Sequence, residues 1–259
     1  MRKQSIFKVP PFLNAMSAES LKSDPINTQF YPFNESIYYQ IGKSFLNGSE
    51  VSSILSLSNT HKVMVDKSRE IGTHVEFAVI GRSNCGKSSL INSLLGHKVA
   101  ITSKTPGKTQ QLITHTLKLD LPFKVSLVDA PGYGYADAPA AEMNKWRNFV
   151  EKYFEQSPNL LNTLLLIDSR RGIMDSDKIL LEMLDDLKRM STIVLTKADN
   201  LNATKLRDAM IKVAHDAAKF KRTFGLIFAT SSKEHYGIEE LQAYLSYSLL
   251  NNTGAYIKE

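Results

Sequence analysis

A phosphate-binding signature constrains the fold of this chain more than any other feature of its sequence. Residues 81–88 read Gly-Arg-Ser-Asn-Cys-Gly-Lys-Ser, which fits the pattern Gly-x-x-x-x-Gly-Lys-Ser. An apolar run at residues 77–80 precedes it, and an amphipathic segment begins at Lys87. Glycines let the backbone approach a phosphate closely, and the amino end of a helix attracts negative charge. The sequence therefore predicts a strand, a phosphate site and a helix in succession, with adenine and guanine both still open.

The apolar pattern after residue 74 predicts an α/β fold. Short runs rich in β-branched residues alternate with amphipathic segments of helical length, which is typical of a mostly parallel sheet with helices on both faces. The expected strands are residues 77–80, 112–119, 124–129, 163–168, 192–196 and 226–230. The expected helices are residues 87–95, 140–154, 176–190, 203–220 and 238–250. Six strands suit a P-loop GTPase domain.

Three parts are expected along the chain: an N-terminal extension at residues 1–73, a nucleotide-binding domain at residues 74–251 and a C-terminal tail at residues 252–259. The extension is rich in Ser, Asn and aromatic residues, and its prolines interrupt any long helical pattern, so part of it is expected to be disordered. Residues 1–18 are basic and contain no acidic residue, which resembles an organellar transit segment. An ordinary basic terminus explains them equally well, because Pro10 and Pro11 would break the amphipathic helix of such a signal.

Composition narrows the classes of partner and site. The formal net charge of +6 favours a polyanionic partner. In and just after the fourth expected helix the basic residues are Lys205, Arg207, Lys212, Lys219, Lys221 and Arg222, and Arg170 with Arg171 is a weaker candidate. A solvated helix face explains these residues as well. No apolar run reaches the roughly 20 residues of a membrane-spanning helix, so we expect none. The single cysteine, Cys85, excludes a disulfide framework.

Two further segments predict how the phosphate site is completed. The strand at residues 124–129 ends in Asp-x-x-Gly, where Asp129 can hold a Mg²⁺-bound water and the Gly132 amide can sense the γ-phosphate. Lys87 would neutralise the phosphates, and Ser88 would offer Mg²⁺ a hydroxyl. The polar residues 102–111 are expected to form a mobile switch segment in which Thr109 is the second Mg²⁺ hydroxyl. A simple β-turn in that segment is the alternative.

Residues 196–199 are predicted to select guanine. Asp199 lies just past a predicted strand, where its carboxylate can accept both guanine N1–H and the N2 amino group, a pattern that adenine does not offer. Lys197 would lay its alkyl stem across the base. Many GTPases have Asn where this chain has Thr196. The sequence Ala-Thr-Ser-Ser at residues 229–232 follows the last strand and can offer backbone amides to guanine O6, although an ordinary Ser-rich loop is equally consistent with it.

With these motifs in place, the chain resembles the EngB (YihA/YsxC) family of GTPases. Gly-Arg-Ser-Asn-x-Gly-Lys-Ser-Ser-Leu-Ile-Asn, Thr-Pro-Gly-Lys-Thr-Gln, Asp-x-Pro-Gly-Tyr-Gly-Tyr and Thr-Lys-Ala-Asp occur in order between about residues 77 and 250. The threonine at position 196 belongs to that pattern. The resemblance implies a role in assembling the large ribosomal subunit, with Mg²⁺ as cofactor, GTP and GDP as ligands and low intrinsic hydrolysis.

The resemblance also implies the binding residues. Carried over position by position, they are Gly81, Arg82, Ser83, Asn84, Cys85, Gly86, Lys87, Ser88, Gly107, Lys108, Thr109, Gln110, Gln111, Asp129, Ala130, Pro131, Gly132, Thr196, Lys197, Ala198, Asp199, Thr230, Ser231 and Ser232. Mg²⁺ is expected at Ser88 and Thr109, and the catalytic set is Lys87, Thr109 and Gly132. Cys85 replaces the usual Val at a position that offers mainly its backbone N–H, so we expect an inert small side chain, with an oxidant-sensitive thiol as the alternative.

Slow catalysis is expected from the residue that follows Gly132. GTPases that cleave fast place a glutamine there to orient the attacking water, whereas this chain has Tyr133. We therefore predict slow intrinsic hydrolysis that a partner accelerates. Asn84 occupies the position that some related GTPases use to help hold K⁺, and capping of the loop by the same side chain is an equal alternative.

Two other functions and the location stay open at this stage. A P-loop ATPase is disfavoured by Asp199, and a nucleotide-gated binding module without significant hydrolysis remains an alternative. The expected partners are GTP and a large-subunit precursor or its ribosomal RNA, and a monomer is favoured. Because bacterial family members are generally shorter at the amino end, a mitochondrial member is our hypothesis, with a cytoplasmic location as the alternative.

Overall fold

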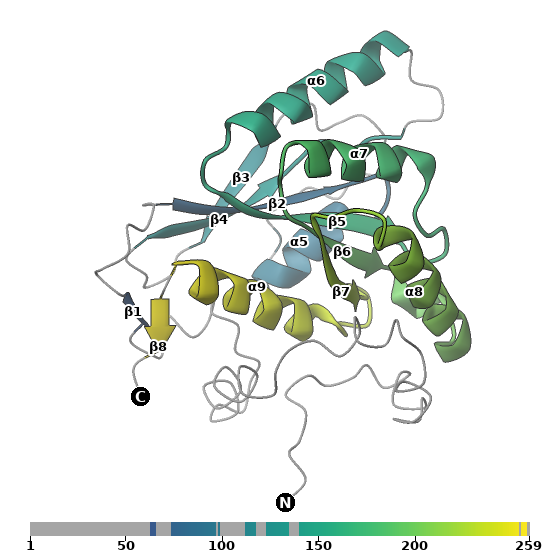
Figure 1. Cartoon of the computed structure of the whole chain (residues 1–259). Coiled ribbons are helices and arrows are strands. Elements are labelled where there is room, and N and C mark those ends of the chain that lie inside the picture. Colours follow the sequence, from purple (N-terminus) through teal and green to yellow (C-terminus); the bar gives the residue numbers. More distant parts are fainter. Residues whose placement is uncertain are drawn as a thin grey trace, which may run out of the picture.

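The structure is a computed structural model that describes residues 63–65, 74–96, 98, 112–117, 123–134, 140–253 and 255–257. Figure 1 shows a central sheet with helices on both of its faces. The transit-like segment at residues 1–18 and the expected switch segment at residues 102–111 lie outside the described residues. The expectations attached to both segments therefore stay predictions.

A six-stranded sheet forms the centre of the domain, as predicted. Its strands are β2 His74–Gly81, β3 Ile113–Leu117, β4 Lys124–Asp129, β5 Leu160–Asp168, β6 Ser191–Thr196 and β7 Thr223–Ala229. Their order across the sheet is β3-β4-β2-β5-β6-β7. Only the edge strand β3 runs antiparallel to its neighbour, and the other neighbouring pairs are parallel. The predicted architecture, a six-stranded and mostly parallel sheet with helices on both faces, is confirmed (Figure 1).

Helices cover both faces of the sheet and bury one apolar cluster on each (Figure 1). They are α5 Lys87–Leu95, α6 Ala140–Gln156, α7 Asp175–Asp186, α8 Ala203–Ala217 and α9 Ile238–Thr253. α5 and α9 pack on one face, and α6, α7 and α8 pack on the other. Successive side chains of a strand point to opposite faces, so in β2 Phe77 and Val79 enter the first cluster while Ala78 and Ile80 enter the second. This explains why the inner strands are almost continuously apolar.

Several predicted boundaries were wrong by three or four residues, and two of them have identifiable reasons. α7 ends at Asp186 rather than at residue 190, because Lys188 adopts the left-handed conformation with φ 56°. The Arg189 N–H then donates to the Leu184 carbonyl at 2.8 Å, which closes the helix as a Schellman-type end. β5 begins at Leu160, three residues before its predicted start. The prediction placed the start after Asn162 because this residue is polar, whereas the structure buries it and its amide donates to Thr192 and Tyr244.

A small second sheet joins the two outer parts of the chain. β1 Val63–Val65 pairs antiparallel with β8 Ala255–Ile257. The sequence assigned no strand to either region, because a three-residue strand carries almost no periodic signal. The division into an extension, a domain and a tail stays a prediction. Among the helices of the described residues, none combines the length and apolar character that crossing a membrane requires.

The carboxyl ends of the parallel strands form one edge of the sheet, and the candidate site lies along it. In the register of the sheet Val79 stands opposite Asp129 and Gly81 opposite Leu166, while Asp168 stands opposite Thr196. Parallel strands end together at such an edge, which is where open α/β sheets bind ligands. The motifs that the sequence placed after separate strands therefore meet here.

Candidate functional site

The phosphate loop is a tight turn between β2 and α5. Asn84 and Gly86 both have positive φ, 63° and 101°, so the loop needs one residue that tolerates this conformation and one glycine. A Cβ on Gly81 would lie 2.6 Å from the Leu166 carbonyl oxygen. No side chain caps the amino end of α5 among the described residues, and its first turn holds no acidic residue. The positive end of this helix is therefore open to an anion.

Lys87 and Asp129 contact each other at the start of α5. The Lys87 ammonium donates to Asp129 Oδ1, and the side chains are only 11% and 4% exposed. A buried ammonium needs an anionic partner, and a phosphate in this loop offers one in place of the carboxylate. Ser88, the second residue of α5, is half-buried. The predicted phosphate and Mg²⁺ residues 87, 88 and 129 are thus on neighbouring elements, whereas residues 107–111, including Thr109, lie outside the described residues.

The Asp-x-x-Gly segment runs along the phosphate loop. The Ala130 N–H donates to the Val79 carbonyl at 3.0 Å. Further on, the Tyr133 N–H donates to the Gly81 carbonyl at 3.3 Å and the Ser83 N–H donates to the Tyr133 carbonyl at 2.8 Å. Gly132 lies between these contacts and has no room to spare, because a Cβ there would be 3.3 Å from the Gly81 carbonyl oxygen. The structure therefore brings Gly132 directly against the loop that the sequence assigned to phosphate.

Position 134 favours glycine. Gly134 has φ 73°, and a Cβ on it would lie 2.8 Å from Nε of Arg82. A larger residue would be strained in this backbone conformation and would have to displace the arginine side chain. The Arg82 side chain thus lies against the segment that follows Gly132. Burial raises the pKa of the nearby Asp177 carboxyl, and the charge of Arg82 is one of the smaller effects that oppose this shift.

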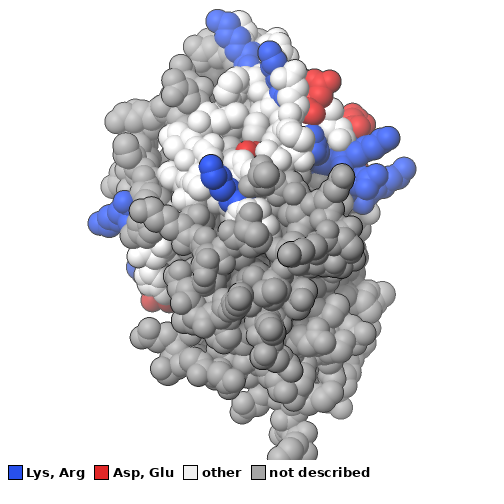
Figure 2. Space-filling view, turned by 90° about the vertical axis from the view of Figure 1, so that its left-hand side faces the viewer, with Lys and Arg blue, Asp and Glu red and all other residues white. Residues whose placement is uncertain are grey.

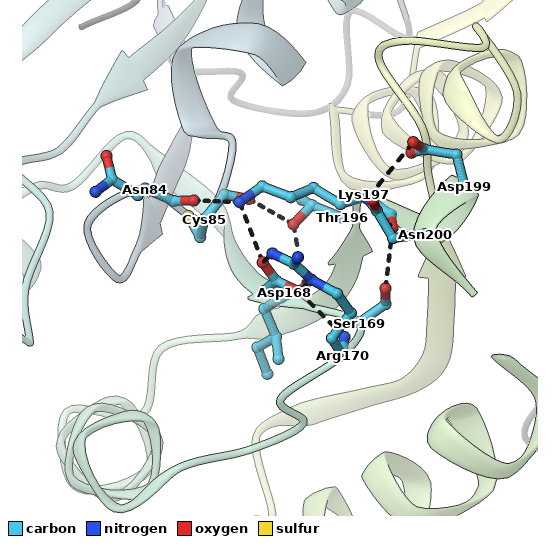
Figure 3. A network of polar contacts seen from close by, with 10 residues as sticks. Asn84, Cys85, Asp168, Ser169, Arg170, Thr196, Lys197, Asp199 and Asn200 are labelled. Atoms are coloured by element: carbon cyan, nitrogen blue, oxygen red, sulfur yellow. Dashed lines mark hydrogen bonds and ion pairs between the residues drawn. The ribbon is translucent and has the colours of Figure 1, made fainter. Parts of the chain in front are cut away.

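The residues predicted to select guanine are tied to the phosphate loop. The Thr196 hydroxyl donates to the Cys85 carbonyl and is 3.3 Å from the Ile167 carbonyl. Lys197, in the left-handed conformation with φ 55°, donates its ammonium to the Asn84 carbonyl (Figure 3). A Cβ on Gly86 would be 3.7 Å from Cε of Lys197, so the lysine stem passes over the loop. The short side chain of Thr196 therefore bridges the phosphate loop and strand β5.

The two segments that the sequence assigned to guanine, residues 196–199 and 229–232, meet at Asp199. The Ser231 hydroxyl donates to Asp199 Oδ1 at 2.7 Å, and the Ala198 N–H donates to the Thr230 carbonyl at 3.0 Å. Asp199 is half-buried, with one carboxylate oxygen held by serine. Asp199 also helps raise the pKa of Tyr236 to about 12, an effect that comes first from burial and then from this charge. Thr230 and Ser231 thus contact the segment that carries Asp199.

Sequence reasoning missed Asp168, which ends β5 at the centre of the site (Figure 3). Its carboxylate accepts from Nε and Nη2 of Arg170 at 2.9 and 2.7 Å and from Nζ of Lys197 at 3.1 Å. Burial raises the pKa of Asp168, but the bonds from Arg170 and Lys197 outweigh it and lower the pKa to about 2. Arg170 forms this ion pair while its side chain stays 49% exposed, so its assignment as a weaker RNA contact stays a prediction. An acidic residue at the carboxyl end of a strand was the available signal.

The structure favours the inert interpretation of Cys85. Its side chain is 3% exposed and belongs to the apolar cluster beneath α5 and α9. Burial raises the pKa of the Cys85 thiol to about 12, against smaller opposing effects of Lys87 and Lys197. A protonated, buried thiol is a poor nucleophile. Its backbone carbonyl, which holds Thr196, is the functional part of this residue.

Comparison with known proteins gives matches along most of the described domain. A family model described as a 50S ribosome-binding GTPase matches residues 76–197. A protein of Rhodospirillum rubrum named probable GTP-binding protein EngB is 41% identical over 173 residues, which cover 66% of this chain and 75% of that protein. A protein of the same name from Nitrobacter hamburgensis is 44% identical over 170 residues, which cover 65% and 77%.

Solved structures agree with the fold. The crystal structure of a probable GTP-binding protein EngB is 23% identical, with a TM-score of 0.51, over 67% of this chain and 98% of that one. A variant of Era from Aquifex aeolicus bound to GDP·AlF4⁻ is 19% identical, with a TM-score of 0.57, over 73% of this chain and 58% of that one. At these identities the likeness concerns the fold alone.

Proposed function

Because this chain belongs to the EngB family of P-loop GTPases, we propose that it acts as a slow guanine-nucleotide switch in the assembly of the large ribosomal subunit. GTP binding and hydrolysis are properties of the family. The observation that carries the guanine assignment is the meeting of Asp199, Lys197 and Ser231 beside the phosphate loop. The description of the matching family model, a 50S ribosome-binding GTPase, supports the ribosomal part.

The chain's own residues divide the work of binding phosphate. The open amino end of α5 offers backbone N–H groups, and Lys87 exchanges Asp129 for phosphate oxygens when nucleotide binds. Released from Lys87, the Asp129 carboxylate becomes available as an oxygen acceptor. Lys87 thus has an anionic partner in each state, which lowers the cost of burying its charge.

The oxygen donors at this site fit Mg²⁺. A serine hydroxyl from Ser88 and a carboxylate from Asp129 lie on adjacent elements, and Mg²⁺ prefers such hard oxygen ligands. Ser88 would coordinate directly together with Thr109, and Asp129 would act through a water. Bound Mg²⁺ screens the negative charge of the phosphates during transfer. For K⁺, with Asn84 as the candidate ligand, equal hydrolysis rates in KCl and NaCl would exclude a role.

Asp199 selects the base through its carboxylate. Ser231 holds Oδ1, which orients the group so that it can accept both donors of the guanine edge. Lys197 packs its stem on the base plane while its ammonium stays on the Asn84 carbonyl. Competition of a labelled GTP analogue by GDP but not by ATP is the expected result, and effective competition by ATP would favour a P-loop ATPase instead.

Slow intrinsic hydrolysis is supported by the position of Tyr133. Its side chain is 5% exposed and its hydroxyl donates to Asp177, so it is not free to orient an attacking water. We propose that a ribosomal partner accelerates turnover by ordering residues 102–111 or by supplying a group. Turnover of the purified chain alone as fast as that of a partner-stimulated GTPase would contradict this. A complete lack of stimulation by ribosomal precursors would favour the nucleotide-gated binding module.

The surface of α8 and the loop after it is our candidate RNA contact. Lys205, Lys212, Lys219, Lys221 and Arg222 are exposed there. The Asp185 carboxylate accepts from the backbone N–H groups of residues 221 and 222, which fixes this loop and leaves its basic side chains outward. On the face seen in Figure 2, by contrast, the described Lys and Arg side chains are spread over the top and sides, with acidic ones near some of them.

Charge reversal tests this contact. Lys219→Glu with Lys221→Glu should weaken retention on large-subunit precursors, and wild-type retention should fall steeply with salt, because phosphate contacts release counterions. Lys145→Glu with Lys152→Glu, on exposed positions of α6, is the matched control. Equal losses in both pairs would show that only net charge matters, and unchanged retention in the first pair would exclude this surface.

We also propose a mitochondrial location, on the basis of the basic, acid-free residues 1–18. A full-length fusion that stays in the cytosol without cleavage would defeat it. Depletion of the protein, followed by sedimentation of ribosomal subunits from cytosol and organelle, tests pathway and compartment together. Loss of the large subunit in the organelle alone is the expected result.

A further inference from the structure

A buried hydrogen bond joins the segment after Asp129 to α7. Tyr133 donates its hydroxyl to Oδ1 of Asp177 at 2.6 Å, and the two residues are 5% and 1% exposed. The other carboxylate oxygen of Asp177 accepts from the Met174 N–H at 2.7 Å, which caps the amino end of α7. Both oxygens of this carboxylate are therefore engaged, one on the helix and one on the tyrosine.

The same short segment is held from two further sides. The Tyr133 ring lies 5.1 Å from the ring of Trp146 on α6, and the indole N–H of Trp146 donates to the Pro131 carbonyl at 3.0 Å. On the opposite side, the Tyr133 backbone bonds to Gly81 and Ser83 of the phosphate loop. Gly132 lies between two residues whose positions are thus fixed by side-chain contacts with α6 and α7.

The location of these contacts matters because of what Gly132 is expected to do. The Asp-x-x-Gly motif predicts that its N–H contacts the γ-phosphate, which GTP has and GDP lacks. A backbone amide that is already in place binds without an ordering cost, whereas a loosely held one loses part of its binding energy to becoming ordered. The contacts of Tyr133 should therefore affect the affinity for GTP more than the affinity for GDP.

We propose that Asp177 is a positioning residue that acts through Tyr133 to preset the Gly132 amide for the γ-phosphate, and so sets the preference of the site for GTP over GDP. The proposal rests on the proposed function as a guanine-nucleotide switch and on the predicted contact of Gly132 with that phosphate. It assigns a role in nucleotide discrimination to a buried carboxylate on α7, outside the nucleotide-binding motifs.

Removal of one hydroxyl tests the proposal in the full-length chain. Tyr133→Phe keeps the ring on Trp146 and deletes the bond to Asp177. Dissociation constants in the presence of Mg²⁺ are measured for GDP and for a non-hydrolysable GTP analogue. We expect the dissociation constant of the GTP analogue, divided by that of GDP, to rise about fivefold or more, while the dissociation constant of GDP changes less than about twofold. Asp177→Asn should shift the ratio in the same direction. Trp146, the single tryptophan of the chain, reports the change by its emission.

The matched control is Tyr153→Phe. Tyr153 lies on α6 and donates its hydroxyl to Glu76 at 3.1 Å, so this variant deletes the same group from a similar bond far along the chain from Gly132. Both dissociation constants should match those of the wild type. A general loss of stability lowers the affinity for both nucleotides together and leaves their ratio unchanged.

Several results would overturn the proposal. They are an unchanged ratio in both Tyr133→Phe and Asp177→Asn, an equal loss for the two nucleotides, or tighter binding of the GTP analogue, which would mark the bond as a restraining contact. If Tyr133→Phe unfolds, Asp177→Asn alone decides. A wild-type chain that binds neither GTP nor GDP would instead refute the proposed function, so the two failures are distinguishable.

Discussion

Substitution of Asp168 by Asn tests how the base side of the site is held together. Asp168 accepts from Lys197 at 3.1 Å, and Lys197 also donates to the Asn84 carbonyl (Figure 3). Asn is isosteric with Asp but carries no charge, so the substitution keeps the shape of the site and removes the anionic partner of Lys197. The lysine that packs on guanine then has one firm contact instead of two.

The magnitude follows from the exposure of the pair. Lys197 is 32% exposed, so water screens the interaction and a value near the low end for hydrogen bonds to charged groups is appropriate, about 1.5 kcal/mol. Because the Asn84 carbonyl still holds the ammonium, we expect the free energy of nucleotide binding to lose most but not all of this hydrogen-bond energy. A loss of about 1.4 kcal/mol corresponds to a tenfold faster dissociation of GDP.

The assay is the release of a fluorescent GDP analogue, chased by excess GDP in a stopped-flow instrument. Asp175→Asn is the control, because Asp175 pairs with Lys178 at 2.8 Å on the surface of α7, away from the site motifs. Its release rate should equal that of the wild type. A release rate for Asp168→Asn within twofold of the wild type, in a chain that unfolds at the same temperature, would refute the reasoning.

Three further predictions concern single groups. Asp168 has a pKa of about 2 in the folded chain, below its ordinary value of 3.8, so its stabilising contribution is complete above about pH 4 and is lost as the pH falls toward 2. The free energies of unfolding of the wild type and of Asp168→Asn should therefore converge between about pH 4 and pH 2. Arg189→Ala removes donors to the Phe154 and Glu155 carbonyls at the end of α6 and should lower the free energy of unfolding by about 2 kcal/mol in urea titrations, while an unchanged midpoint would contradict the capping role. Cys85 should react with a thiol reagent only on unfolding, and rapid labelling of the native chain would disprove its burial.

Local signals in the sequence were sufficient for most of the fold. The start of α5 at Lys87 and both ends of β4 agree with prediction, because a glycine-rich turn and an apolar run with sharp polar limits mark them. The six strands of the central sheet and its helix-covered faces also follow from periodicity. The ends of α7 and β5 did not, since the first depends on a lysine in a glycine-like conformation and the second on a buried asparagine.

The candidate site shows the same division. The sequence by itself determined which segments carry phosphate and guanine chemistry, because their residue types and spacing are local properties of the chain. Only the tertiary structure decided that Asp168 pairs with Lys197, that Thr196 holds the Cys85 carbonyl and that Tyr133 is anchored on Asp177. These bonds join residues 29 to 111 positions apart. No spacing rule reaches that far, since the order of strands in the sheet brings these residues together.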